Sequence, residues 1–300
     1  MPEPLILIHH KAHLDTSDTP PNSLAGVRAC LDHGAPIIEI DVIALASDDF
    51  LLVHDHELAS ETTGNGAVGD CTPQTARSLH LKPHREGASV HPVALLSDVV
   101  TALRDHSGTT RLHVDWKDYY PFPTDEPLHR LARILKPLGD RVFLTHCADW
   151  QLRRLRRIAP WLEIGFEVQF YFDLRDPAGD YDPMMPPYRQ GAYGFHDDHP
   201  LALAQSWPIE AYLADRCDML LHQAPGISTV CVSHHTLMAC LNHGFNWADA
   251  VRDAGLTIST WTLDADNPVA LSNARTLYDA GIRRFTSNTP LALAQHLNSG

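Results

Sequence analysis

Two acidic residues stand two positions apart in an apolar run, at Glu39 and Asp41 of the stretch PIIEIDV. Side chains two apart on a strand point to the same face, roughly 7 Å apart along the chain. A third carboxylate, Asp115, stands in a similar run, RLHVDW. Three such oxygen ligands at strand ends suit one hard divalent cation, Mg²⁺ or Ca²⁺, and leave positions open for a substrate. The structural alternative is that a buried lysine or arginine neutralises them.

Two histidines also stand at the ends of apolar runs. His10 closes LILIHH and His54 closes FLLVH, so both can reach the same rim of an α/β barrel. Two histidines that face one reacting centre can divide the acid and base roles. The chain has 20 histidines, so a histidine taken singly is more commonly a surface or hydrogen-bonded residue. His9 and His13 are assigned to that class.

Neighbouring residues are candidates for substrate binding. Lys11 follows His10, and Lys117 stands two residues after Asp115, so either ammonium group could offset a phosphate, although a lone lysine is usually solvated. Trp261 ends the run LTISTW and could form an apolar wall, although a large aromatic residue there is more often barrel packing. Two weaker pocket candidates, each equally consistent with a structural role, are His146 and Glu167.

The elements that must position these residues form a regular alternation. Short β-rich runs alternate with helical patterns, which is typical of βα units around a parallel sheet. After the first run, Asn22 or Ser23 can cap a helix that ends near Gly34. The eight predicted strands are residues 5–10, 36–42, 111–116, 141–145, 162–168, 217–221, 256–261 and 283–286. A single α/β barrel, spanning residues 1–300 as one domain, fits this pattern.

Two segments interrupt the alternation. The run at residues 50–54 follows the second strand too closely for a parallel crossover, so we expect an antiparallel hairpin arm. Residues 56–110 then form a predicted insertion subdomain whose helix, LLSDVVTALRDH, has Ser97 as its expected N-cap. A second excursion, residues 172–213, is rich in Pro, Asp and aromatic residues and has no readable periodicity. Long insertions in barrels often shape the binding face.

Composition narrows the class of protein. The 300 residues are 44% hydrophobic, which is enough for a large core. The net charge of -14 leaves no basic stripe for nucleic acid or an anionic membrane, so a small-molecule partner is expected. No apolar stretch approaches the roughly 18 residues of a membrane span, and MPEPLILIHH has no basic signal region, so a cytoplasmic location is expected. The six cysteines make no CxxC pair, which favours reduced thiols. The oligomeric state is left open.

The motifs, taken in order, resemble those of the glycerophosphodiester phosphodiesterase family. The resemblance extends over residues 5–290, and the ordered set is far more specific than any single piece. The matching residues are His10, Lys11 and Ala12 for the family's His-Arg-Gly; Pro20, Pro21, Asn22 and Ser23 for its Pro-Glu-Asn-Thr; Glu39 and Asp41 for its Glu-x-Asp; His54 and Asp55 for its His-Asp; Thr62, Thr63, Asn65 and Gly66 for its Thr-Thr-x-Gly-x-Gly; Asp115, Trp116 and Lys117 for its Glu-x-Lys; Trp261 and Thr262 for its Trp-Thr; and Asn288 and Pro290 for its Thr-Asn-x-Pro.

This resemblance implies a (β/α)8 TIM barrel that holds one divalent metal ion through Glu39, Asp41 and Asp115. It also implies that His10 and His54 are the acid/base pair for hydrolysis of glycerophosphodiesters to glycerol 3-phosphate and an alcohol. In the family, the neighbouring glycerol hydroxyl is thought to attack, and water then opens the cyclic phosphate. Which histidine is the acid is left open.

Several departures from the family pattern bear on the substrate. Lys11 replaces an arginine, which exchanges a bidentate fork for a point charge. Asp115 is one methylene shorter than the family's glutamate. Ala12 replaces a glycine and Pro21 replaces a glutamate. His56 is an additional histidine that could supply a further ligand.

Three other readings compete with hydrolysis. Cyclising phospholipase D and sphingomyelinase D relatives share the metal barrel and two histidines but stop at the cyclic phosphate. A barrel that binds a phosphorylated ligand without turnover is suggested by the departures at Lys11, Ala12 and Asp115. A zinc amidohydrolase would need a His-x-His pair on the first strand, which LIHHKAH lacks. Its candidate ligands would be His9, His10, His54 and His56.

Overall fold

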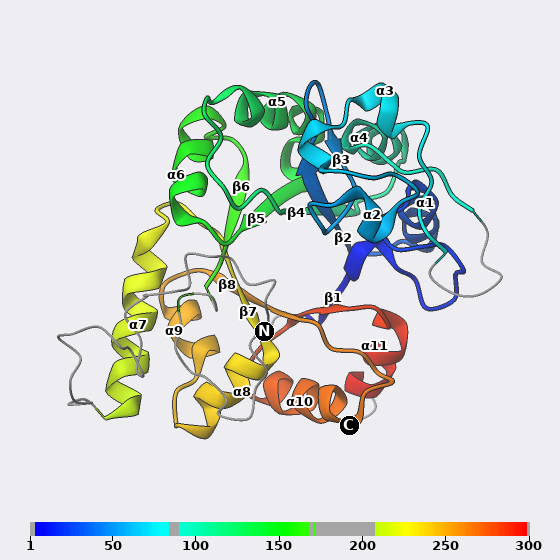
Figure 1. Cartoon of the computed structure of the whole chain (residues 1–300). Coiled ribbons are helices and arrows are strands. Elements are labelled where there is room, and N and C mark those ends of the chain that lie inside the picture. The colour runs from blue at the N-terminus through cyan, green and yellow to red at the C-terminus, as the bar shows by residue number, and fades with distance from the viewer. Residues whose placement is uncertain (1–3, 84–89, 169–170, 172–207, 299–300) are drawn as a thin grey trace.

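Eight parallel strands close into a barrel in the computed structural model, which describes residues 4–83, 90–168, 171 and 208–298 (Figure 1). The first strand pairs with both the second and the last, which closes the ring. The barrel strands are β1 (Ile6–His9), β2 (Ile37–Ala44), β4 (Arg111–Trp116), β5 (Val142–His146), β6 (Glu163–Glu167), β7 (Thr229–Ser233), β8 (Thr257–Trp261) and β9 (Arg284–Ser287). The predicted (β/α)8 TIM barrel is confirmed.

Helices surround the strands (Figure 1). The first helix, α1, begins and ends as its sequence predicts. The Ser23 hydroxyl caps its start by accepting a hydrogen bond from the Gly26 amide, and Gly34 ends it with a left-handed φ of 79°. The α-helices are α1 (Leu24–His33), α2 (Leu58–Glu61), α3 (Pro73–Ala76), α4 (Leu96–Asp105), α5 (Glu126–Leu135), α6 (Asp149–Ile158), α7 (Ile209–Gln223), α8 (His234–Asn242), α9 (Trp247–Asp253), α10 (Pro268–Asp279) and α11 (Pro290–Asn298). Short 3₁₀ turns are η1 (His10–Ala12), η2 (Val68–Asp70) and η3 (Lys136–Arg141).

One predicted strand is wrong. Residues 217–221 lie inside helix α7, and the barrel strand at this point is β7, Thr229–Ser233. The buried positions of α7 are Tyr212, Leu213, Cys217 and Leu220, which is helical spacing. The sequence TVCVS, by contrast, is rich in β-branched residues, which suits a strand buried on both faces.

The predicted hairpin arm after β2 is present but short. Strand β3 (Phe50–Leu51) runs antiparallel to the end of β2, and His54 lies three residues beyond it. Figure 1 shows α2 and α3 (cyan) grouped near β3. These elements pack around a second apolar cluster, separate from the main core, that includes Leu58, Val68 and Ala76.

The last part of the predicted insertion, helix α4, packs with the barrel. Leu96, Val99 and Leu103 belong to the main core rather than to the second cluster. The expected N-cap is wrong: the cap position is Leu95, whose amide donates to the Asp98 carboxylate at 3.2 Å. Ser97 lies within the first turn instead, where its hydroxyl donates to Asp49.

Most of the second excursion, residues 172–207, lies outside the described residues, and its last five residues, 209–213, are the first residues of α7. All six cysteines of the chain are buried, and none forms a disulfide bond. No helix among residues 4–83, 90–168 and 208–298 is both long and apolar enough to span a bilayer.

Candidate active site

Three carboxylates meet at the ends of two adjacent barrel strands. Glu39 and Asp41 lie on β2, and Asp41 pairs in register with Asp115 on β4. Each of the three offers an oxygen, and these oxygens all lie within 4.8 Å of one another. Glu39 and Asp41 are buried, whereas Asp115 is partly exposed. The sequence predicted this cluster, because side chains two apart on a strand share a face and parallel neighbours align their ends.

Two lysines neutralise part of this charge. The Lys117 ammonium group lies 2.6 Å from Asp115 Oδ2 and 3.2 Å from Asp41 Oδ1. The Lys11 ammonium group lies 3.4 Å from Asp41 Oδ2. Both lysines therefore contact the carboxylates, as expected from the alternative in which buried basic residues neutralise the cluster. When all three carboxylates are ionised, they exceed the two ammonium groups by one negative charge.

Burial and the neighbouring charges shift the pKa values of the three carboxylates in different directions. Burial raises the pKa of Glu39 well above its usual range, and the charges of Asp41 and Asp115 add to the effect. Burial also acts to raise the pKa of Asp41, but Lys117 and Lys11 overcome it and hold that pKa well below its usual value. The pKa of Asp115 is raised by burial against the opposing charge of Lys117. An additional cation would therefore favour the ionised form of Glu39 most.

The loop after β1 forms hydrogen bonds with two carboxylates of the cluster. The Lys11 backbone amide donates to Glu39 Oε2 at 2.7 Å. The Asn22 side chain donates to Asp41 Oδ2 at 3.0 Å and accepts from the Asp41 amide at 3.1 Å. Lys11, Ala12 and Asn22 have positive φ values of 51°, 55° and 53°. Asn tolerates this region well, which explains why it suits this position. The sequence marked Asn22 as a possible cap and as part of a motif that resembles the family's, but its contact with Asp41 was missed.

His10 stands beside Glu39 at the start of η1, one residue after β1. Its Nε2 lies 4.0 Å from Glu39 Oε2, and its Nδ1 lies 2.8 Å from Asn288 Oδ1. Burial lowers the pKa of His10 to about 4, against a smaller raising effect of Asp41. The ring is therefore held neutral, with one nitrogen toward the carboxylates.

His54 approaches the same carboxylates from the hairpin side. Its Nδ1 lies 2.8 Å from Asp55 Oδ1. Glu61, on α2, accepts hydrogen bonds from the backbone amides of His54 at 2.6 Å and Asp55 at 3.2 Å, and so fixes the turn. Both His54 and His10 lie near enough to Asp41 that a positive charge on either ring would lower the pKa of Asp41. The structure thus brings the two predicted histidines to one centre, and Glu61 is a support that the sequence did not reveal.

Other candidates lie elsewhere or are already engaged. His56 Nε2 lies 2.9 Å from the Lys117 carbonyl oxygen, so this nitrogen serves the backbone rather than a metal ion. His146 is fully buried, its ring centroid lies 4.6 Å from that of Trp116, and burial lowers its pKa to about 3. Glu167 lies near enough for its charge to raise the pKa of Lys117. Trp261 ends β8 and is partly exposed.

A four-histidine zinc centre is not formed. His9 Nδ1 lies 3.0 Å from the His13 carbonyl oxygen and 3.7 Å from Cys30 Sγ, in the interior. Within the part of the chain that the structure describes, the three carboxylates are the one group of three or more residues with metal-ligand spacing. The four candidate ligands of the alternative amidohydrolase reading therefore form no metal site.

The donor set fits a hard divalent cation. All three groups are carboxylates, which Mg²⁺ and Ca²⁺ prefer over softer ligands. Glu39 Oε1 is buried and has no hydrogen-bond partner, so one oxygen of the cluster stands ready for a ligand. Lys117 shares two of the acceptors, and a metal ion would compete with its ammonium group for them.

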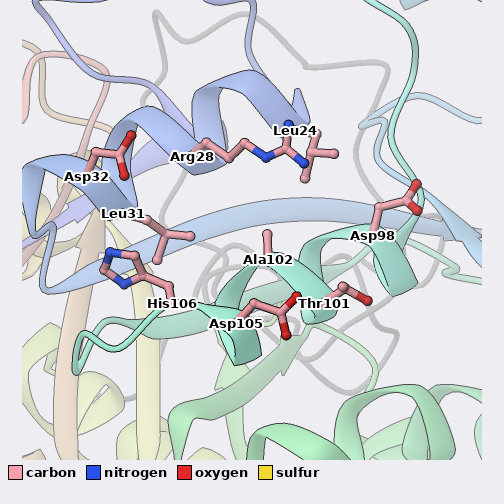
Figure 2. A pocket seen from close by; sticks show the side chains of 9 residues that line it. All are labelled: Leu24, Arg28, Leu31, Asp32, Asp98, Thr101, Ala102, Asp105 and His106. Atoms are coloured by element: carbon pink, nitrogen blue, oxygen red, sulfur yellow. The ribbon is translucent and has the colours of Figure 1, made fainter.

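A separate hollow of about 380 Å³ lies in the outer layer between α1 and α4 (Figure 2). Arg28 and Asp32 line it from α1, and Asp98 and Asp105 line it from α4. Asp98 is already paired with Arg77 at 3.0 Å. This hollow holds neither the carboxylate cluster nor the His10 and His54 pair.

Comparisons with known proteins identify a family for this chain. The sequence model of the glycerophosphoryl diester phosphodiesterase family matches residues 15–184. A glycerophosphodiester phosphodiesterase from Caldanaerobacter subterraneus subsp. tengcongensis is 23% identical over 194 residues, which cover 64% of this chain and 74% of that protein. Two solved structures share the fold. One, a glycerophosphodiester phosphodiesterase from Parabacteroides distasonis, has a TM-score of 0.62 at 16% identity and covers 98% of this chain and 97% of its own. The other, an Oleispira antarctica phosphodiesterase in complex with the product sn-glycerol-3-phosphate, has a TM-score of 0.62 at 13% identity, with 98% and 96% covered.

Proposed function

Because the chain belongs to the glycerophosphoryl diester phosphodiesterase family, we propose that it hydrolyses glycerophosphodiesters to glycerol 3-phosphate and an alcohol. The observation that carries the proposal is the convergence of His10 and His54 on one carboxylate cluster at the barrel rim. Active sites of TIM barrels form at this end of the strands. The product named for the Oleispira antarctica relative supports the same substrate class.

Glu39, Asp41 and Asp115 are the residues that would hold one divalent ion, Mg²⁺ or Ca²⁺. Such an ion supplies Lewis-acid neutralisation of the non-bridging phosphate oxygens. The unpartnered Glu39 Oε1 and the excess negative charge support this role.

His10 and His54 are proposed as the acid/base pair. Cleavage needs a base for the attacking hydroxyl and an acid for the leaving alcohol, and the two rings approach the cluster from β1 and from the hairpin. The attacking group is the neighbouring glycerol hydroxyl, which gives a cyclic phosphate that water then opens. His10 presents Nε2 on the carboxylate side, so that atom is the one that exchanges the proton.

Lys11 and Lys117 bind the phosphate in this proposal. Their side chains are about 21% and 11% exposed, so both ammonium groups are partly shielded from water at the edge of the cluster. Partial shielding strengthens attraction to an anion. Trp261 is proposed as an apolar wall for the alcohol group, from its place at the end of β8. A cytoplasmic location is proposed because none of the six cysteines forms a disulfide bond.

The test is phosphorus NMR of the protein with glycerophosphocholine, glycerophosphoethanolamine and a lysophospholipid, with Mg²⁺, with Ca²⁺ and with chelator. We expect metal-dependent glycerol 3-phosphate. His10→Ala and His54→Ala should each abolish turnover with metal affinity nearly intact, and Glu39→Ala should lose both. His129→Ala, an exposed histidine of α5, is the matched control.

Each other outcome has a distinct meaning. A persistent cyclic phosphate would assign the chain to the cyclising relatives, and metal binding without any product would favour the inactive barrel. A His54→Ala protein with full activity would remove His54 from the acid/base pair.

A further inference from the structure

Asp264 lies outside the cluster of Glu39, Asp41 and Asp115, and it binds Asn288, the residue that contacts the His10 ring. Asp264 lies just after β8, and Asn288 lies just after β9. Asp264 Oδ2 accepts a hydrogen bond from Asn288 Nδ2 at 2.8 Å, and its Oδ1 accepts from the Asn288 backbone amide at 2.7 Å. A further hydrogen bond joins the segments that follow β8 and β9, because the Ala265 amide donates to the Thr289 hydroxyl at 2.6 Å. Asn288 is thus held by both its side chain and its backbone.

The register of the barrel places this pair against His10. His9 on β1 pairs with Ser287 on β9, so the residues that follow each strand end are neighbours. The Asn288 carbonyl oxygen also accepts a hydrogen bond from the His13 ring at 2.7 Å. Asn288 therefore has little freedom to move away from the His10 ring.

The hydrogen-bond types settle the orientation of the Asn288 amide. An ionised carboxylate can only accept, so the Asn288 group that faces Asp264 is the NH₂. The amide oxygen then faces His10, at 2.8 Å from Nδ1. Because this oxygen also can only accept, His10 Nδ1 must carry the hydrogen. In the neutral ring, Nε2 is then the unprotonated nitrogen, and it is the one that lies 4.0 Å from Glu39.

We propose that Asp264 is a positioning residue that acts through Asn288 to hold His10 in the Nδ1–H tautomer, with the Nε2 lone pair turned toward the reacting centre. The proposal rests on the acid/base role proposed for His10. It differs from the arrangement at His54, whose Nδ1 contacts the Asp55 carboxylate directly. At His10 a neutral amide stands between the ring and the carboxylate, so orientation is transmitted without a direct ion pair.

The first experiment reads the tautomer in the unaltered protein. Histidine labelled with ¹⁵N reports Nδ1–H and Nε2–H tautomers through distinct ring nitrogen shifts and long-range couplings. His10→Gln identifies the His10 signals by their disappearance, and the spectra are recorded near neutral pH in the presence of chelator. We expect His10 as the Nδ1–H form. An Nε2–H form in the unaltered protein would overturn the proposal.

The second experiment changes Asp264 alone. In Asp264→Asn the new amide can donate as well as accept, so Asn288 can turn over and present its NH₂ to His10. We expect the His10 signals to move toward the Nε2–H form and kcat to fall about 10- to 100-fold, with KM unchanged. Asp266→Asn, an exposed aspartate in the same loop, is the matched control and should leave both unchanged. Unaltered kcat and tautomer in a folded Asp264→Asn protein would refute the role.

The two proposals fail separately. Full activity in His10→Gln would remove His10 from the reaction and leave the tautomer result standing. An inactive His10→Gln protein together with an Nε2–H ring in the unaltered protein would instead reject Asp264 as the positioning residue. A thermal melt of each variant shows whether it is folded.

Discussion

The Lys117 ammonium group lies 2.6 Å from Asp115 Oδ2. The two residues are two positions apart at the end of β4, so their side chains point to the same face. Burial acts to lower the pKa of Lys117, but Asp115 and Asp41 overcome it and raise that pKa well above its usual range. The same two carboxylates are proposed metal ligands. A metal ion and the Lys117 ammonium group therefore share acceptors, and each should weaken the hold of the carboxylates on the other.

Replacing Lys117 by methionine tests this competition. Because the variant removes a positive charge beside the ligands, we expect Mg²⁺ or Ca²⁺ to bind about tenfold tighter, which corresponds to ~1.4 kcal/mol. KM for the phosphodiester should rise, because a phosphate-binding cation is lost. Calorimetric titration and steady-state kinetics measure the two effects. Lys136→Met, an exposed lysine stacked on Trp161, is the control. Weaker metal binding in Lys117→Met would contradict the competition.

Glu39→Gln should act in opposite directions with and without metal. The buried carboxylate has an oxygen without a partner, so in chelator the neutral amide should leave the free energy of unfolding unchanged or higher. At metal concentrations about a hundred times the dissociation constant, the unaltered protein gains about 2.7 kcal/mol, and the variant should gain much less. Denaturant unfolding with Mg²⁺ and with chelator measures this. The exposed Glu210→Gln should behave like the unaltered protein. Equal metal stabilisation in Glu39→Gln would exclude Glu39 as a ligand.

Gly26→Ala should disturb the site through the backbone. A Cβ at Gly26 would lie 2.6 Å from the Ala12 carbonyl oxygen, which belongs to the turn that carries His10 and Lys11. The turn must shift, so we expect a loss of about 1–3 kcal/mol in unfolding free energy and a lower kcat. At Gly69 an added Cβ meets nothing within 4 Å, so Gly69→Ala is the control. Unaltered stability and kcat in Gly26→Ala would show that the turn can relax freely.

His234 should make the protein sensitive to acid. The residue begins α8, is 5% exposed, and burial, followed by the charge of His235, lowers its pKa to about 4. In the unfolded chain the pKa is about 6.5. As the pH falls, protons therefore bind His234 in the unfolded chain before they bind it in the folded protein. The contribution of His234 to the unfolding free energy is complete above pH 6.5 and is lost as the pH falls toward 4.

Between about pH 7.5 and about pH 5, this histidine should account for ~2 kcal/mol of the fall in unfolding free energy. His234→Asn should remove that part of the fall, and His129→Asn, at an exposed position, should not. Urea unfolding at both pH values measures the difference. An identical fall in His234→Asn and the unaltered protein would contradict the assignment.

Local patterns were sufficient for seven of the eight barrel strands and for the approach of Glu39, Asp41 and Asp115. The period of two along a strand and the alignment of parallel strand ends fix those positions without further information. The exception, residues 217–221, failed because a short apolar run does not distinguish a strand from the buried side of a helix. The packing of Cys217 and Leu220 in α7 decided between them.

By itself, the sequence predicted the barrel, the carboxylate cluster and the two histidines that approach it, because these depend on residue type, on spacing within each strand and on the alignment of parallel strands. Only the tertiary structure decided the partners of each group. Asn288 lies 278 positions from His10, and Asp264 reaches it from yet another loop. Glu61 and Asn22 likewise fix His54 and Asp41 through hydrogen bonds between elements. Such contacts depend on how the segments beyond the strand ends fold against one another, and no periodicity along the chain records that folding.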